Sequence, residues 1–108
     1  MELDKENGNF VAWSLGDFIG DANRAGSEYS VVLDLEIVKD LESGKTTVNS
    51  FKYTPIFTVD EEGKPLRVVR IAETMKAFDE EYLDSVSQET SDAMTYALKR
   101  IEDRIKAE

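Results

Sequence analysis

Histidine and cysteine are both absent from this chain of 108 residues. Without them the chain cannot form a Ser-His-Asp triad, a Cys-His dyad or any of the common zinc or iron sites from its own residues. The lack of cysteine also excludes disulfides and thiol chemistry. An enzyme built from this chain alone would depend on carboxylates, Lys, Arg, Tyr or an oxygen-ligated Mg²⁺ or Ca²⁺. We therefore expect no catalytic activity, and we assign no catalytic, cofactor-binding or metal-binding residues.

Basic residues and long apolar runs are also scarce. The chain has 13 Lys and Arg against 23 Asp and Glu, and this net charge of −10 repels a phosphate backbone, so nucleic acid is not an expected partner. The longest apolar stretches, such as Phe10 to Trp13, fall far short of the roughly 18 residues that span a bilayer. Residues 1–5 lack the basic and apolar parts of a signal peptide. Length and composition predict a single domain over residues 1–108.

Hydropathy patterns divide the chain into a run of strands followed by a run of helices. Apolar residues alternate with more polar ones from Tyr29 to Ile37, which predicts a strand with one buried face. Asn7-Gly8 is typical of a hairpin turn. The predicted strands cover residues 9–14, 29–37, 46–57 and 66–72, with an irregular connection at 15–27 and hairpin turns at 39–45 and 60–65.

Two residues of the third predicted strand call for special geometry. Val48 and Phe51 have opposite parity, which indicates a β-bulge or a strand with apolar contacts on both faces. Pro55 has no N–H and places the end of this strand at an edge or a bend.

The last third of the chain has helical spacing. Met75, Phe78 and Tyr82 predict a short helix over residues 74–84. Ser85-Val86-Ser87-Gln88 has the form of a capping box before a second helix. One apolar stripe then continues to the C-terminus through Met94, Ala97, Leu98, Ile101 and Ile105. The predicted fold is α+β, with an antiparallel sheet of about four strands followed by two C-terminal helices packed on one face.

The most distinctive string is Trp13-Ser14-Leu15-Gly16-Asp17-Phe18, where a strand gives way to a turn. Ser14 is not expected to be a nucleophile, because Ala12 replaces the first glycine of a nucleophile elbow and no histidine can accept the serine proton. We expect instead that Ser14 and Asp17 hydrogen-bond the backbone of a tight turn, and that Trp13 and Phe18 pack in the core.

This string resembles the C-terminal part of the bacterial poly-gamma-glutamate capsule biosynthesis (CapA-type) family, in which the corresponding residues usually read Y-S-L-G-N-F. The alternating strand from Tyr29 and the later Tyr53-Thr54-Pro55 are similar to that family's downstream segment, so the resemblance covers residues 9–56. The departures are Trp13 for tyrosine and Asp17 for asparagine. The second departure replaces an amide donor with a carboxylate that can only accept.

The resemblance implies a parent protein of the calcineurin-like metallophosphoesterase type, located in the cell envelope or outside the cell. The metal ligands of that parent would lie upstream of Ser14-Leu15-Gly16. This chain would then be a C-terminal fragment whose partner is the remainder of the parent chain. Its role would be to complete the sheet and one wall of the parent's domain, without catalysis of its own.

Other interpretations come from the residues alone. The acidic surface and an exposed strand edge would suit an independent protein-interaction module, or a homodimer formed through that edge. Asp17 and Asp21 could form a carboxylate-only site for Mg²⁺ or Ca²⁺. Asp60-Glu61-Glu62-Gly63 does not have the spacing of a calcium loop, and we expect it to be a solvated hairpin tip.

Overall fold

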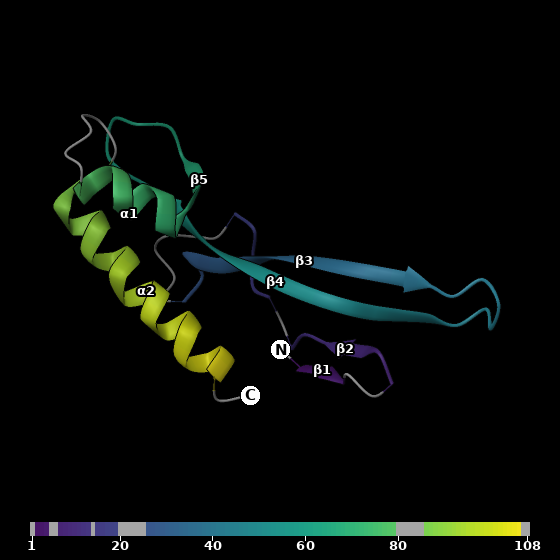
Figure 1. The fold of residues 1–108 in the computed structure, drawn as a ribbon. Helices are drawn as coiled ribbons and strands as arrows, with labels where there is room; N and C mark the ends of the chain where they lie inside the picture. The colour runs from purple at the N-terminus through teal and green to yellow at the C-terminus, as the bar shows by residue number, and fades with distance from the viewer. Residues whose placement is uncertain (1, 5–6, 14, 20–25, 80–85, 107–108) are drawn as a thin grey trace.

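The computed structural model describes residues 2–4, 7–13, 15–19, 26–79 and 86–106. Its elements are β1 (Glu2–Asp4), β2 (Asn9–Val11), β3 (Tyr29–Lys39), β4 (Thr46–Val59), β5 (Arg67–Arg70), α1 (Ile71–Asp79) and α2 (Gln88–Lys106). The helices lie at one end, and β3 and β4 extend away from them as a long arm (Figure 1), so that the molecule measures 56 × 26 × 23 Å. The predicted α+β class is confirmed.

The described strands form two antiparallel sheets, where the sequence predicted one antiparallel sheet of about four strands. One sheet has the order β3-β4-β5, and β1 and β2 form a separate hairpin. The strand predicted over residues 9–14 is limited to β2 and pairs with β1. This pairing is local because Gly8 in the connection adopts φ of +71°, a conformation that glycine reaches without strain.

The β1-β2 hairpin lies against β4 near the middle of the long arm. The backbone N–H of Val48 donates to the Gly8 carbonyl at 2.7 Å, and the rings of Phe10 and Phe51 are 4.8 Å apart between centroids. A Cβ on Gly8 would overlap the Thr47 side chain. A glycine at this position therefore lets the two backbones approach closely.

The β-bulge predicted from Val48 and Phe51 is confirmed. Glu36 pairs with Ser50, but Ile37 pairs with Val48, so the register shifts and Asn49 is the extra residue. Because side chains alternate between faces, this shift brings Val48 to the same face as Phe51. The Asn49 side-chain amide donates to the Glu36 carboxylate at 2.6 Å, which connects the two strands across the bulge.

Pro55 lies near the end of β4, which extends two residues beyond the predicted Phe57. It pairs with Val31 inside β4, which continues to Val59. β5 pairs with β4 only from Ile56 onward, so among the described strands β4 has a single neighbour at Pro55. Proline is tolerated at such a position, because no second strand lies there with an acceptor for the N–H that proline lacks.

The core forms where one face of the sheet meets the two helices. Its buried side chains are Phe57, Val59, Ile71, Met94, Ala97 and Ile101. The last three belong to the apolar stripe predicted for the second helix, so this part of the prediction is confirmed. No helix in the described ranges is long and apolar enough to cross a membrane.

Both helices begin at positions that differ from the prediction. α1 starts at Ile71 rather than residue 74, because the chain turns into the helix directly after β5 and buries Ile71. Residues 80–84 of the predicted first helix lie outside the described residues, as does Ser85 of the predicted capping box. The N-cap of α2 is Ser87, whose hydroxyl accepts from the Thr90 N–H at 3.2 Å.

Candidate functional site

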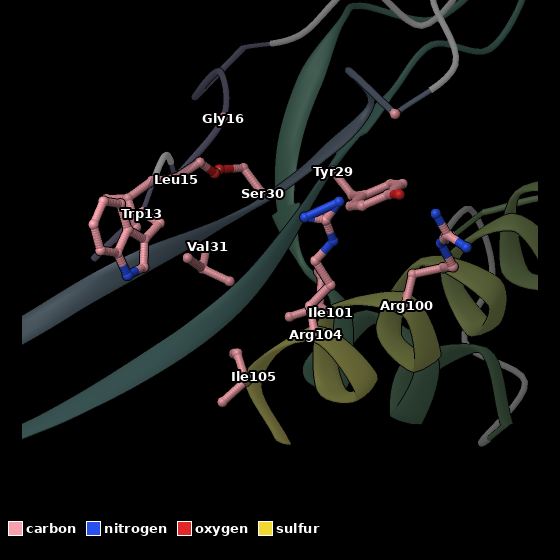
Figure 2. A pocket seen from close by; sticks show the side chains of 11 residues that line it. Trp13, Leu15, Gly16, Tyr29, Ser30, Val31, Arg100, Ile101, Arg104 and Ile105 are labelled. Carbon is pink, nitrogen blue, oxygen red and sulfur yellow. The ribbon is translucent and has the colours of Figure 1, made fainter. Parts of the chain in front are cut away.

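A cleft of about 400 Å³ opens between β3, the second half of α2 and the segment around Trp13. Figure 2 shows the side chains that face it from these three parts of the chain. Its walls combine aromatic, aliphatic, small polar and basic groups. The lining residues are Trp13, Leu15, Gly16, Gly26, Tyr29, Ser30, Val31, Arg100, Ile101, Arg104 and Ile105.

The N-terminal wall of the cleft is held against β3 by Ser30. This serine is buried, and its hydroxyl donates to the Leu15 carbonyl. Gly16 adopts φ of +86°, and a Cβ there would come within 3.3 Å of the Ser30 hydroxyl. The turn thus depends on a serine from the following strand. The predicted role of Ser14 falls outside the described residues, while Asp17 accepts a hydrogen bond from the Ser27 hydroxyl at 3.3 Å.

Trp13 and Phe18 do not pack in the core, contrary to the prediction. Trp13 is 69% exposed and Phe18 is 62% exposed. The segment runs beside the start of β3, and the core lies on the face of the sheet that the helices cover. Phe18 lines a groove on the other face together with Val32 and Ile56. The sequence marks these residues as apolar but gives no information on which side of the sheet they meet.

Two arginines of α2 form the basic wall of the cleft. Arg100 and Arg104 are one turn apart and project toward β3, with Tyr29 between their guanidinium groups in the view of Figure 2. Their neighbours Ile101 and Ile105 pack in or against the core, which fixes this face of the helix. Neither arginine was identified from the sequence. The sequence feature that could have identified them is their i,i+4 spacing, which places both on one side of the helix beside the apolar stripe.

The charge on Arg100 is stabilised by its surroundings. A hydrogen bond with the Tyr29 hydroxyl raises the pKa of the guanidinium, with smaller contributions from Tyr96 and Asp103. The Arg100 Cζ also lies 5.9 Å from the centre of the Tyr96 ring, within cation–π range. Arg100 therefore stays fully protonated, and one of its neighbours, Tyr29, is itself part of the cleft wall.

Glu61 is not part of a solvated hairpin tip, contrary to the prediction. Its side chain is only 12% exposed. The carboxylate accepts from the Ser87 N–H at 2.8 Å and from the Thr90 hydroxyl at 2.9 Å, and Lys64 lies 3.4 Å away. The bond from the Ser87 backbone is the main cause that lowers the pKa of Glu61 to about 2. Glu61 thus fixes the start of α2.

The carboxylate-only metal site proposed from Asp17 and Asp21 gains no support. Asp21 lies outside the described residues, and among those described no group of three or more Asp or Glu is placed to hold a metal ion.

Comparison of the chain with protein families, curated proteins and solved structures finds no match.

Proposed function

We propose that this chain is the C-terminal portion of a CapA-type capsule-biosynthesis protein, in which it completes a metallophosphoesterase-like domain and performs no catalysis by itself. The proposal is motivated by the string from Trp13 to Phe18, which resembles that family. The remainder of the parent chain would be its main partner, and the cell envelope its location.

The exposure of that string is the structural observation that supports the proposal most. Trp13 and Phe18 are large apolar side chains held in an ordered turn at the edge of the sheet. An aromatic side chain buries about 150–250 Å² when it is covered, which stabilises a protein by a few kcal/mol at roughly 25 cal/mol per Å². Two such exposed side chains are therefore expected to be covered by another part of the same protein.

The sheet offers a second surface of this kind. The helices pack on one face, and on the opposite face Val32 and Val68 line a groove beside Phe18, together with Asp34, Lys52 and Arg70. A parent domain that packs against this groove would bury both the groove and the exposed turn.

The natural gene gives the direct test. We expect the reading frame to continue upstream of the Met1 codon and to encode Asp, Asn and His residues at metal-ligand spacing. An in-frame stop codon immediately before Met1 would overturn the proposal.

The lack of catalysis is tested with the purified chain in Mn²⁺ or Mg²⁺ and p-nitrophenyl phosphate. Turnover that a single substitution such as Asp17→Asn abolishes would contradict it.

The alternative function is a self-contained interaction module, and one observation favours it. Among the described strands β3 pairs only with β4, so its other edge can accept a further strand. Ile37, near the end of that strand, is 63% exposed. In a homodimer the β3 edges of two copies would pair.

Sedimentation velocity of the purified chain tests the alternative. If the β3 edge forms a dimer, Ile37→Lys should convert the dimer to a monomer. Leu41→Lys is the matched control, because Leu41 is 88% exposed but lies in the turn beyond the strand. A monomer in the unmodified chain, or equal effects of both substitutions, would exclude the edge-paired dimer.

A further inference from the structure

The cleft beside Trp13 differs in charge from the rest of the molecule. The chain has a net charge of −10, yet among the described residues that line the cleft there are two arginines and no carboxylate. A second cleft near the start of α2 shows the opposite character, since Glu28, Asp60, Glu61, Glu62 and Glu89 are among its lining residues. Of these two clefts, the one beside Trp13 is therefore the one that attracts an anion.

The ion pairs of the described part of the chain include Lys64 with Glu61 and Arg70 with Glu73, and neither of these contains Arg100 or Arg104. Arg100 has the charge of Asp103 nearby, which contributes to raising its pKa. A favourable interaction with the C-terminal end of the helix dipole applies to Arg104, in the last turn of α2, but not to Arg100, which lies one turn earlier. Guanidinium groups in this arrangement are ready to receive an external anion.

The other walls of the cleft supply an apolar surface next to these charges. Trp13, Leu15 and Val31 face the cleft from the side opposite α2 (Figure 2). The Ser30 hydroxyl and the Gly16 backbone lie between the apolar and basic walls. A volume of about 400 Å³ falls in the range of about 300–1,000 Å³ that is usual for small-molecule sites.

We propose that this cleft binds a small organic anion, with its oxyanion group held by Arg104, its apolar part against Trp13, and the charge of Arg100 adding to the attraction. The oxyanion is a carboxylate or a phosphate, because a guanidinium donates two parallel hydrogen bonds to either group. This site goes beyond the proposed function, although both proposals use the exposed side chain of Trp13. Anion binding is tested on the purified chain and the proposed function on the gene, so the failure of one is distinguishable from the failure of the other.

Trp13 makes the proposal directly testable, since it is the single tryptophan of the chain and lies in the cleft wall. The purified chain is titrated with benzoate, with phenyl phosphate and with the neutral benzyl alcohol, and Trp13 fluorescence is followed. We expect a saturable change with at least one anion and none with benzyl alcohol over the same concentrations. Binding should weaken as NaCl is raised. An equal response to benzyl alcohol, or no saturable response to either anion, would overturn the proposal.

Substitutions locate the anion on the arginines. Arg104→Gln should weaken anion binding at least tenfold, and Arg104→Lys should give an intermediate loss because it keeps the charge without the planar fork. Lys99→Gln removes the same charge from the same helix outside the cleft and should change the affinity less than twofold. Circular dichroism confirms that each variant is folded. An equal loss in Arg104→Gln and Lys99→Gln would show general electrostatic attraction and contradict the assigned site.

Discussion

Glu61 shows how a single charged residue can organise two distant parts of the chain. Its carboxylate lies in the connection between β4 and β5, and it accepts from the backbone of Ser87, 26 positions later. In a capping box the helix supplies its own Glu or Gln for this purpose. Here the acceptor comes from a separate loop, so the bond also ties that loop to α2.

We predict that Glu61→Gln lowers the free energy of unfolding at pH 7 by about 1–3 kcal/mol, because the charged hydrogen bonds to Ser87 and Thr90 become neutral ones. Urea denaturation measures this change. Glu62→Gln is the matched control, since Glu62 is exposed next to Glu61 and should change stability by less than about 0.5 kcal/mol. Equal effects of the two substitutions would contradict the role assigned to Glu61.

The same carboxylate predicts a pH dependence. The folded pKa of Glu61 is about 2, below the ordinary value of 4.5, so its contribution to stability is complete above about pH 5 and is lost as the pH falls toward 2. The stability difference between the unmodified chain and Glu61→Gln should therefore shrink over this range. Urea denaturation series at pH 7, 5, 4 and 3 measure it. A difference that stays constant down to pH 3 would contradict the lowered pKa.

Gly8 carries a second prediction at the residue scale. Gly8→Ala would place a Cβ into the Thr47 side chain, so the β1-β2 hairpin should separate from β4. Hydrogen exchange at the Val48 amide, which donates to the Gly8 carbonyl, should become at least tenfold faster. Gly44→Ala is the matched control, because Gly44 has the same φ of +71° and a Cβ added there would meet no atom within 4 Å. Equal exchange in the two variants would show that backbone strain alone is responsible.

Predictions from the sequence about single residues include both a correct one and two wrong ones. The opposite parity of Val48 and Phe51 indicated a bulge or a strand with apolar contacts on both faces, because strand geometry fixes which face each side chain takes, and the structure has the bulge. The charged run around Glu61 gave the wrong prediction, since composition describes a solvated turn equally well and the partner at Ser87 is distant in sequence. The exposure of Trp13 was not predicted for the same reason. Whether a side chain is buried depends on contacts with helices and strands that are distant in sequence, and a short string of residues does not show these contacts.

At the scale of elements, the start of α2 depends on a small network rather than on one cap. The Ser87 hydroxyl accepts from the Thr90 N–H and lies 3.1 Å from the Thr90 hydroxyl, which in turn donates to Glu61. The sequence predicted a cap two residues earlier, at Ser85. Both serines fit the pattern of an N-cap, and the position of the Glu61 carboxylate distinguishes them.

We predict that Ser87→Ala lowers the free energy of unfolding by about 1 kcal/mol, the usual cost of losing an N-cap side chain. Thermal denaturation followed by circular dichroism measures the loss, and Ser50→Ala, at an exposed position of β4, is the control. Because Ser87 and Glu61 share Thr90, the double variant with Glu61→Gln should lose less stability than the sum of the two single variants. Strict additivity would show that the cap and the carboxylate act separately.

At the scale of the whole molecule, net charge and exposed apolar residues have opposite effects on association between copies of the chain. The net charge of −10 repels other copies of the chain. The exposed apolar residues attract them, and these lie on the turn after β2 and along β3, including Trp13, Phe18, Ile19, Leu35, Ile37 and Val38. Which property dominates depends on ionic strength, because the Debye length falls from about 30 Å at 0.01 M salt to about 10 Å at 0.1 M.

We therefore predict that the chain associates as salt is added at pH 7, with a rise in weight-average mass between 10 and about 300 mM NaCl in sedimentation experiments. Ile37→Lys is a stringent comparison, because it reduces the net charge from −10 to −9 and would promote association if charge alone were decisive. We expect it to reduce association. A mass that does not change with salt would contradict the prediction. Association that stops at two chains favours the paired β3 edge, whereas continued growth favours a surface that the parent protein covers.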